Sequence, residues 1–395
     1  MTLLTSAPTA AGVIGMPATA EVATTTPVTP VCAEAARGPL RQLPVPERIH
    51  ACYSTRFVGD ALDADRAAFH LVAGEEVLPQ AGDVVVARVT RIRSHKQIET
   101  PVSRKATLFE GSLVLLAYGH RYAADFFLAH VPTTLDHCHL VAAGGVAGVV
   151  TEVHGAVDSP TEIEPLGLLA TADGVVNVAA FGAYPNPLDT QPREGRPRVI
   201  AVLGTSMNAG KSTVVACLVN GLSRAGRRVG AGKITGTGAG NDRMHYQDAG
   251  AHAVLDFTDF GYATTFRTRF DDIRALTVNM VNALADTGAD TVIVEIADGI
   301  YQRETALLLR DPVFHASVDA VVFAAADALG ARAGVAELID AGLPVLAASG
   351  IMTRSPLATV EAREVLAQFG VPVVASRDLT DPERALTVSK LEENS

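Results

Sequence analysis

The chain lacks the cysteine pattern of a disulfide-stabilised protein. Its 395 residues include four cysteines, which form no Cys-x-x-Cys pair and show no regular spacing. A disulfide framework is therefore not expected, and a reducing cytoplasm fits the composition best. His137-Cys138-His139 has the residue types of a metal site, but no partners at metal-ligand spacing accompany it. We interpret it as structural.

Membrane and nucleic-acid signals are also missing. There is no run of 18 or more apolar residues, so no segment is predicted to cross a bilayer. No Lys or Arg precedes Arg37, so the N-terminus lacks the basic start of a signal peptide. The formal net charge of −11 is repelled by anionic surfaces, which argues against a nucleic-acid partner. We expect a cytoplasmic protein that acts on a small molecule.

The chain does have the length and apolar content for two domains. Hydrophobic residues make up 48% of the sequence, so each domain can bury its own core. Residues 1–35 are rich in Ala, Thr and Pro with only two charges, and we expect a mobile tail. Residues 184–197 hold four prolines among polar residues and predict a linker, because Pro cannot donate to a strand ladder.

The segment before this linker, residues 36–183, reads as a β-rich domain. It contains short β-branched or apolar runs separated by turn signals, as strands do. Three glycines lie within the apolar run 140–153 and indicate a turn or close backbone packing. The pattern predicts a small barrel or sandwich with strands at 83–92, 112–118, 126–131 and within 140–153.

After the linker, residues 198–395 alternate between strand and helix patterns. Continuous apolar runs of about five residues are typical of buried parallel strands. This alternation predicts an α/β fold, a doubly wound parallel sheet. The predicted strands are 199–203, 229–234, 291–296, 320–325, 344–348 and 371–375, and the predicted helices are 211–225, 273–285, 335–341 and 357–369.

One motif carries chemistry, and it lies between the first of these strands and its helix. It reads Gly204-Thr205-Ser206-Met207-Asn208-Ala209-Gly210-Lys211-Ser212-Thr213. Glycines let backbone N–H groups turn toward phosphate oxygens, and the helix N-terminus adds partial positive charge. Lys211 then suits β- and γ-phosphates, and the Ser212 hydroxyl suits Mg²⁺. The motif predicts a nucleotide-binding P-loop, although Gly204 stands one position further back than is usual.

This spacing resembles the loop of dethiobiotin synthetase and its relatives, Gly-Thr-x4-Gly-Lys-Thr or Ser. Two further segments extend the resemblance over roughly residues 199–350. Gly232-Lys233-Ile234-Thr235-Gly236-Thr237 is similar to Lys-Pro-x-x-Thr-Gly without its Pro, and Val294-Glu295-Ile296-Ala297-Asp298-Gly299 is similar to Val-Glu-Gly-Ala-Gly-Gly. The resemblance implies that Lys211 contacts phosphates, Ser212 and Glu295 hold Mg²⁺, and Lys233 stabilises the transferring group. It also implies a homodimer.

Asp298 departs from that family, which has Gly near this position. A carboxylate there suits a base that deprotonates a substrate hydroxyl, or a second Mg²⁺ ligand. The alternative is an Asp that only starts a turn before Gly299. Both readings stay open on the sequence.

Residues 236–260 form a polar, Gly-rich stretch that we predict to be a long functional loop. It supplies donors and acceptors for a small molecule, and in the resembled family this region meets substrate and metal. A solvated loop is the alternative. The candidate substrate-binding residues are Asp242, Arg243, His245 and Asp248, with Asp242 also a candidate Mg²⁺ ligand.

These observations favour an ATP- and Mg²⁺-dependent kinase, with Lys211, Lys233 and Asp298 as catalytic residues and a small-molecule hydroxyl as acceptor. The segment 349–354 lacks a guanine signature such as Asn-Lys-x-Asp, which favours ATP over GTP. One alternative is a ligase or cyclase like dethiobiotin synthetase, which activates a carboxylate or carbamate. Another is a GTP-dependent accessory protein resembling molybdopterin-guanine-dinucleotide P-loop proteins. The architecture more weakly resembles accessory kinases of polyoxin and nikkomycin pathways, which implies a nucleotide-like acceptor.

Overall fold

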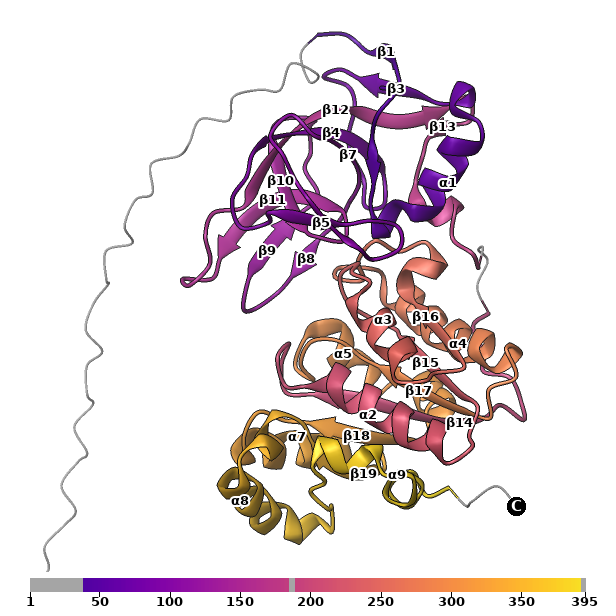
Figure 1. Cartoon of the computed structure of the whole chain (residues 1–395), viewed down its shortest axis with the longest axis vertical. Helices are drawn as coiled ribbons and strands as arrows, with labels where there is room; N and C mark the ends of the chain where they lie inside the picture. The colour runs from indigo at the N-terminus through magenta and orange to yellow at the C-terminus, as the bar shows by residue number, and fades with distance from the viewer. Residues whose placement is uncertain (1–37, 185–188, 392–395) are drawn as a thin grey trace, which may run out of the picture. The chain divides into compact units, whose positions relative to one another are not determined.

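Three sheets organise the computed structural model, which describes residues 38–184 and 189–391 (Figure 1). The predicted tail, residues 1–35, and part of the predicted linker 184–197 lie outside the described residues. These described residues belong to one compact unit. Within the described ranges, no helix is long and apolar enough to span a membrane.

The first domain is a closed barrel with additional strands. Strand β4 pairs with β7 and β12, β7 with β11, β11 with β10, and β10 with β12, so the five strands form a ring. The ring strands are β4 (Val84–Arg91), β7 (Leu113–Tyr118), β10 (Cys138–Ala142), β11 (Val146–Val153) and β12 (Thr161–Thr171). The others are β1 (Arg41–Pro44), β2 (His50–Ala51), β3 (His70–Ala73), β5 (Gln97–Glu99), β6 (Lys105–Thr107), β8 (Arg121–Tyr122), β9 (Phe127–His130) and β13 (Gly174–Val175).

Parts of the barrel strands are apolar on both faces, because both faces are covered there. Along β4, Val85 and Val89 belong to one buried cluster, together with Cys138. Val84 and Val86, on the opposite face of the strand, pack in a second cluster with the helix α1 (Arg56–Ala64). Successive side chains of a strand point to opposite faces, so one strand serves two cores. Cys138 is buried, and burial raises the pKa of its thiol to about 12, which agrees with a structural role.

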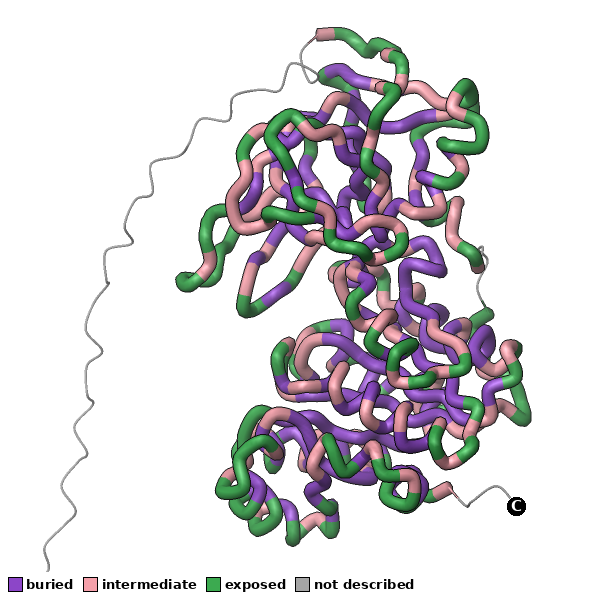
Figure 2. The backbone as a smooth tube through the Cα atoms, in the orientation of Figure 1, coloured by how far each residue is buried: buried purple, intermediate pink, exposed green. Residues whose placement is uncertain are grey.

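The second domain is a six-stranded parallel sheet in the order β16-β15-β17-β14-β18-β19. Each pairing in this sheet is parallel. The strands are β14 (Arg198–Gly204), β15 (Val229–Lys233), β16 (Ala253–Asp256), β17 (Thr291–Glu295), β18 (Ala320–Ala324) and β19 (Val345–Ser349). They are buried along almost their whole length, as Figure 2 shows. The predicted α/β fold with a preceding β-rich domain is confirmed.

Helices cover both faces of the parallel sheet. Ile200 and Val202 of β14 face one cluster with α2 (Lys211–Arg224), α3 (Asn241–Asp248) and α9 (Pro382–Ser389). Val199 and Leu203 of the same strand face the other cluster. That cluster includes residues of α4 (Phe270–Asp286), α5 (Arg303–Leu308), α6 (Pro312–Ser317), α7 (Ala328–Asp340) and α8 (Pro356–Leu366). The sheet is therefore doubly wound.

Two sequence predictions about this domain were wrong. Residues 236–260 are not a long loop, because they contain α3, β16 and a 3-10 turn. The buried Tyr246 packs α3 on the sheet, while the polar residues around it hide the helical period. The predicted strand 371–375 is only a single bridge between Ala348 and Val373. Pro372 has no N–H to extend the ladder there.

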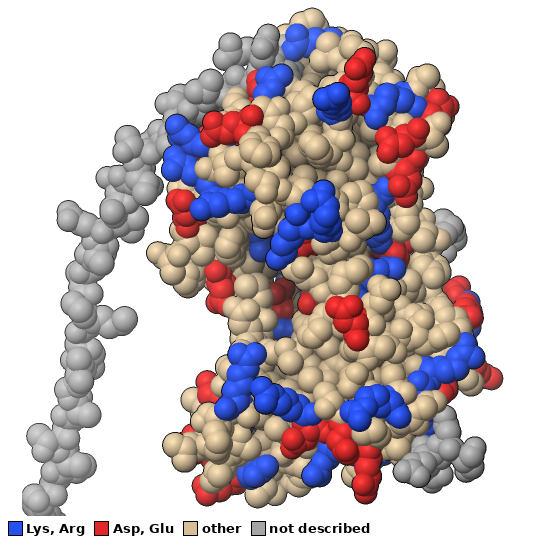
Figure 3. Space-filling model, in the orientation of Figure 1, with Lys and Arg blue, Asp and Glu red and all other residues tan. Residues whose placement is uncertain are grey.

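Side chains of the barrel domain bind the region of α3 and β16. The Tyr53 hydroxyl bonds the Asp256 carboxylate, and Arg56 of α1 donates to Asp259 at 2.6 Å. The Gly240 N–H, at the start of α3, donates to the Glu99 carboxylate at 2.6 Å. These contacts attach the start of α3 and the end of β16 to the barrel. Over the face shown in Figure 3, side chains of both charge signs are interspersed.

Candidate functional site

The loop 205–210 connects β14 to α2 at the carboxyl edge of the parallel sheet. Glycine is required at both of its ends. A Cβ on Gly204 would lie 2.8 Å from the carbonyl oxygen of Ala324, and Gly210 has φ of 94°. This geometry brings the loop backbone to the N-terminus of α2, where peptide N–H groups lack helical partners. An anion is the natural ligand of such a loop.

Two polar groups of the loop are consistent with such a ligand. The Lys211 Nζ donates to the carbonyl oxygen of Ser206 at 2.7 Å and therefore lies over the loop. Burial lowers the pKa of Lys211, while Glu295 and Asp298 oppose that shift. The Thr205 hydroxyl is buried with no hydrogen-bond partner among the described residues. The C-terminal domain has a P-loop nucleotide-binding fold.

Beside the P-loop, Lys233 and Glu295 end adjacent strands. They face each other in the register of β15 and β17, and the Lys233 Nζ lies 3.6 Å from Glu295 Oε1. Lys233 also bonds the Asp242 carboxylate of α3, and the buried Tyr246 hydroxyl bonds Glu295. Burial lowers the pKa of Lys233, but Glu295 and Asp242 together raise it well above its ordinary value. The side chain is thus a fixed ammonium.

Oxygen donors converge at the start of α2 in a way that fits Mg²⁺. The Ser212 hydroxyl lowers the pKa of Asp242 and acts in the same direction on Tyr246, so it lies near both side chains, and the Tyr246 hydroxyl bonds Glu295. Over residues 38–184 and 189–391, no three His, Cys, Asp or Glu gather as a metal cage. Mg²⁺ typically takes one or two carboxylates and completes its shell with water and phosphate oxygens. Ser212 and Glu295 suit that role, with Asp242 beside them.

Asp298 follows β17 and lies against the P-loop. A Cβ on the adjacent Gly299 would come 2.3 Å from the Thr205 carbonyl oxygen, and the Ile300 N–H donates to the Gly204 carbonyl at 3.1 Å. Asp298 itself has φ of 61°, a strained conformation for a residue with a Cβ. Burial raises the pKa of its carboxyl, and Glu295 adds to this, whereas Lys211 and Lys233 lower it.

The structure separates the four residues predicted to bind substrate. Asp242 joins the site through Lys233 and Ser212. Arg243 instead forms an ion pair with Asp259 at 2.5 Å, in the network that reaches the barrel. His245 and Asp248 are exposed on α3. The separation follows from the helical period, which places residues 242, 243 and 248 on different faces.

A hairpin of the barrel domain reaches this site, which sequence reasoning missed. The P-loop residue Asn208 bonds Asp125, which lies between β8 and β9. Tyr122 of β8 borders a small cavity of about 10 Å³ together with Asp298. Burial lowers the pKa of Arg121 to about 10, and Asp298 opposes the shift. The sequence 121–125 has no motif that would point to a distant P-loop.

A larger cavity, of about 680 Å³, adjoins the start of α2. Gly210 and Thr213 border it from the P-loop side. The segment 349–354, which lacks a guanine signature, supplies Gly350 and Arg354 to the same cavity. Its remaining lining residues are Cys217, Ile351, Thr353, Ala375, Ser376, Arg377 and Asp378.

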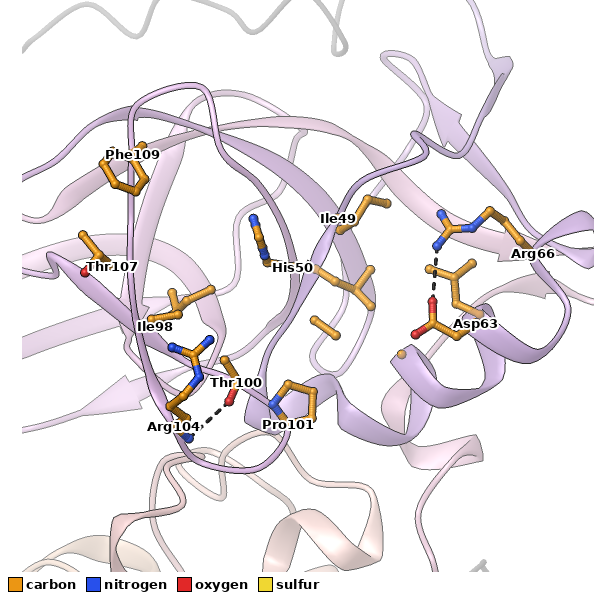
Figure 4. Close-up of a pocket in the computed structure, with 15 residues that line it drawn as sticks. Ile49, His50, Asp63, Arg66, Ile98, Thr100, Pro101, Arg104, Thr107 and Phe109 are labelled. Carbon is orange, nitrogen blue, oxygen red and sulfur yellow. Dashed lines mark hydrogen bonds and ion pairs between the residues drawn. The ribbon is translucent and has the colours of Figure 1, made fainter.

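The barrel domain has a cavity of its own, of about 530 Å³, which Figure 4 shows. It lies between α1 and the hairpin of β5 and β6. Arg66 and Asp63 pair at its edge at 3.3 Å, and Arg104 lies on the hairpin side. Its lining residues belong to the barrel domain, so it is separate from the P-loop site.

No protein-family model and no curated protein matches this chain. Among solved structures, the signal recognition particle 54 kDa protein of Aeropyrum pernix K1 in complex with GDP is similar at 17% identity and a TM-score of 0.36. That likeness covers 51% of this chain and 48% of the other, so this chain spans about half of its length. The signal recognition particle receptor FtsY of Elizabethkingia anophelis in complex with GDP gives 18% identity and a TM-score of 0.34, over 52% of this chain and 68% of the receptor. The activity of this chain does not follow from these likenesses.

Proposed function

We propose that the chain is an ATP- and Mg²⁺-dependent kinase that transfers the γ-phosphoryl group to a hydroxyl of a small molecule. The observation that carries this proposal is Asp298, a half-buried carboxylate held against the P-loop beside Lys211 and Lys233. Its raised pKa brings it closer to the range in which a carboxylate is an effective base near neutral pH. A phosphoryl acceptor needs such a base only if it carries a proton to remove.

The nucleotide fits the P-loop and the cavity that adjoins it. Phosphates on the loop replace the Ser206 carbonyl as the partner of the Lys211 ammonium. The cavity of about 680 Å³ beside Gly210 and Thr213 then accommodates the base and ribose. Arg354 and Arg377 border this space. The segment 349–354 lacks a guanine signature, which favours ATP.

Phosphoryl transfer requires mainly that the acceptor hydroxyl is positioned and that the charge on the transferring group is neutralised. Asp298 accepts the proton of the acceptor hydroxyl, whose oxygen forms a bond to the γ-phosphorus as the bond to the bridging oxygen of ADP breaks. Lys211 and Lys233 neutralise charge on the transferring group. Mg²⁺, held by Ser212 and Glu295, supplies further neutralisation when bound.

The resemblance to dethiobiotin synthetase supports the P-loop subclass and ATP, and Asp298 favours a kinase over that family's reaction. A carboxylate or carbamate acceptor is already deprotonated near neutral pH and has no proton for a base to take. A hydroxyl has one. The extra carboxylate at residue 298, where the family has Gly, therefore supports a hydroxyl acceptor.

Incubation with ATP, Mg²⁺ and a panel of nucleoside acids tests the proposal. The expected product gains the mass of one phosphate as an acid-stable ester, with an equal amount of ADP. Asp298→Asn should lose most of this transfer, and Arg363→Gln, an exposed site on α8, should keep it. An acid-labile acyl phosphate would indicate the ligase reaction instead. Full transfer by Asp298→Asn would contradict the role of this carboxylate.

A further inference from the structure

A cavity of about 240 Å³ lies between the barrel and the P-loop domain. None of the roles assigned above uses it. Its lining residues come from both domains, and they are Ala81, Gly82, Tyr118, His120, Asn177 and Ala179 on the barrel side and Gly261–Thr264, Phe266–Arg269 and Asp272 on the other. Because the two domains meet here, a ligand in this cavity would contact both.

The cavity is bordered by cations. Arg267 and Arg269 both line it, and in the described parts of the chain neither guanidinium forms an ion pair. Asp272 is the acidic residue among the described lining residues. Two guanidinium groups against one carboxylate leave an excess of positive charge. An anion from outside the chain would balance it.

His120 borders the cavity on the barrel side, and His130 lies beside it. The rings of His120 and His130 lie 5.6 Å apart, and the His120 Nδ1 accepts a hydrogen bond from the Val131 N–H at 3.3 Å. Burial, and after it Arg267, lowers the pKa of both imidazoles, which indicates that the guanidinium lies close to the two rings. A neutral His120 that accepts at Nδ1 carries its proton on Nε2, where it can donate to an anion.

Arg267 adopts an unfavourable backbone conformation. Its φ is 61°, which is unfavourable for a residue with a Cβ. The buried Glu304 stabilises this conformation by accepting from the Arg267 N–H at 2.9 Å. Glu304 also borders the small cavity at Asp298, and the Phe266 ring lines both spaces. The cationic border is therefore adjacent to the proposed base.

We propose that this cavity binds an anionic group, a carboxylate or a phosphate, of the acceptor whose hydroxyl lies at Asp298. The proposal rests on the proposed kinase function, because that function places the hydroxyl. It restricts the acceptor to small acids or phosphorylated metabolites. Arg267 provides the main charge and a bidentate donor face, and His120 provides a second donor. A volume of about 240 Å³ holds such a group with a few carbon atoms.

The ring protons of His120 and His130 report on occupancy by NMR, with assignments from His120→Gln and His130→Gln. The full chain is first saturated with Mg²⁺ and ADP, which fills the P-loop. Inorganic phosphate and acetate are then titrated separately. We expect a saturable shift of the His120 signal with at least one of the two anions. The anion that binds more tightly indicates whether the acceptor carries a phosphate or a carboxylate. No saturable shift with either would overturn the proposal.

Arg267→Gln supplies the matched test. We expect its anion affinity to fall at least tenfold, while Arg363→Gln keeps the affinity of the unmodified chain. Retained ADP binding shows that each variant is folded. Equal affinity in Arg267→Gln and the unmodified chain would overturn the proposal. The readout is binding and not turnover, so loss of the anion site and loss of kinase activity are separate results.

In turnover, Arg267→Gln should raise the KM for an anionic acceptor at least tenfold and leave the KM for ATP within twofold. A purely structural role would move both constants or the melting temperature. An unchanged acceptor KM, measured with an acceptor that the unmodified chain phosphorylates, would contradict the assignment. If no acceptor is phosphorylated, the kinase proposal fails, and the anion titration still decides whether the cavity is a binding site.

Discussion

Replacement of Lys233 by Met should lower both stability and activity, and the structure gives the size of the first effect. Lys233 lies between the carboxylates of Asp242 and Glu295, and its side chain is 16% exposed while that of Glu295 is 3% exposed. Removing one partner of a buried ion pair leaves an uncompensated charge and costs about 3 kcal/mol. For a domain of this size, that corresponds to a fall in melting temperature of about 6–12 °C.

The same reasoning predicts a partial rescue. In the double variant Lys233→Met with Glu295→Gln, the stranded carboxylate is also gone, so about 1–2 kcal/mol should return. Activity should not return, because both side chains belong to the proposed phosphoryl-transfer site. Lys233→Met should reduce kcat about 10²-fold or more, as removal of a charge-stabilising group does.

Chemical denaturation of the three proteins, with phosphate transfer assayed on each, measures both effects. The matched control is Arg363→Gln, which should change neither stability nor rate. A loss below about 1 kcal/mol in Lys233→Met would refute the inferred burial of the ion pair. Recovery of kcat in the double variant would show that Lys233 acts on structure alone.

Three further predictions follow from the site. Asp298→Asn should be more stable than the unmodified chain at pH 7 but not at pH 3. A carboxyl whose pKa is raised by folding loses its proton less readily in the folded state, so it destabilises the fold as the pH rises. Thermal melts at both pH values measure this, and an equal stability difference at the two pH values would contradict it. Gly299→Ala should raise the KM for ATP and lower stability by about 1–3 kcal/mol, since its Cβ would come 2.3 Å from the Thr205 carbonyl oxygen. Gly155→Ala, with open space around it, is the matched control for melting and kinetics. Equal melting temperatures and KM values in the two variants would refute the clash. Asp125→Ala should raise the KM for ATP roughly twofold to tenfold through loss of its bond to Asn208, with an unchanged melting temperature. An unchanged KM would show that the hairpin of β8 and β9 does not stabilise the P-loop.

Much of the second domain could be predicted because its signals are local. The P-loop directly follows the strand 199–203 and directly precedes the helix that begins at Lys211. The strand and helix that identify the motif as a P-loop could therefore be predicted from the neighbouring sequence. Lys233 and Glu295 each end an apolar run. The carboxyl ends of parallel strands share one edge of the sheet, and the register of β15 and β17 brings the two side chains together.

The helix α3 and the hairpin at the P-loop could not be predicted, because they depend on tertiary contacts that no local sequence pattern indicates. The helix α3 depends on Tyr246, whose burial is invisible in a stretch dominated by polar residues and glycine. Its Gly240 is anchored by Glu99, 141 residues earlier in the chain. Likewise, nothing in the segment 121–125 indicates that it meets Asn208 of the P-loop. Such pairs become neighbours only when both domains have folded.

Titration calorimetry with a non-hydrolysable ATP analogue and Mg²⁺ measures whether the P-loop binds a triphosphate. We expect saturable binding at one site, with affinity at least a hundredfold lower in Lys211→Ala and unchanged in Arg363→Gln. Circular dichroism shows whether each variant is folded. Equal affinity in a folded Lys211→Ala would contradict the assignment of the 204–213 loop as the triphosphate site.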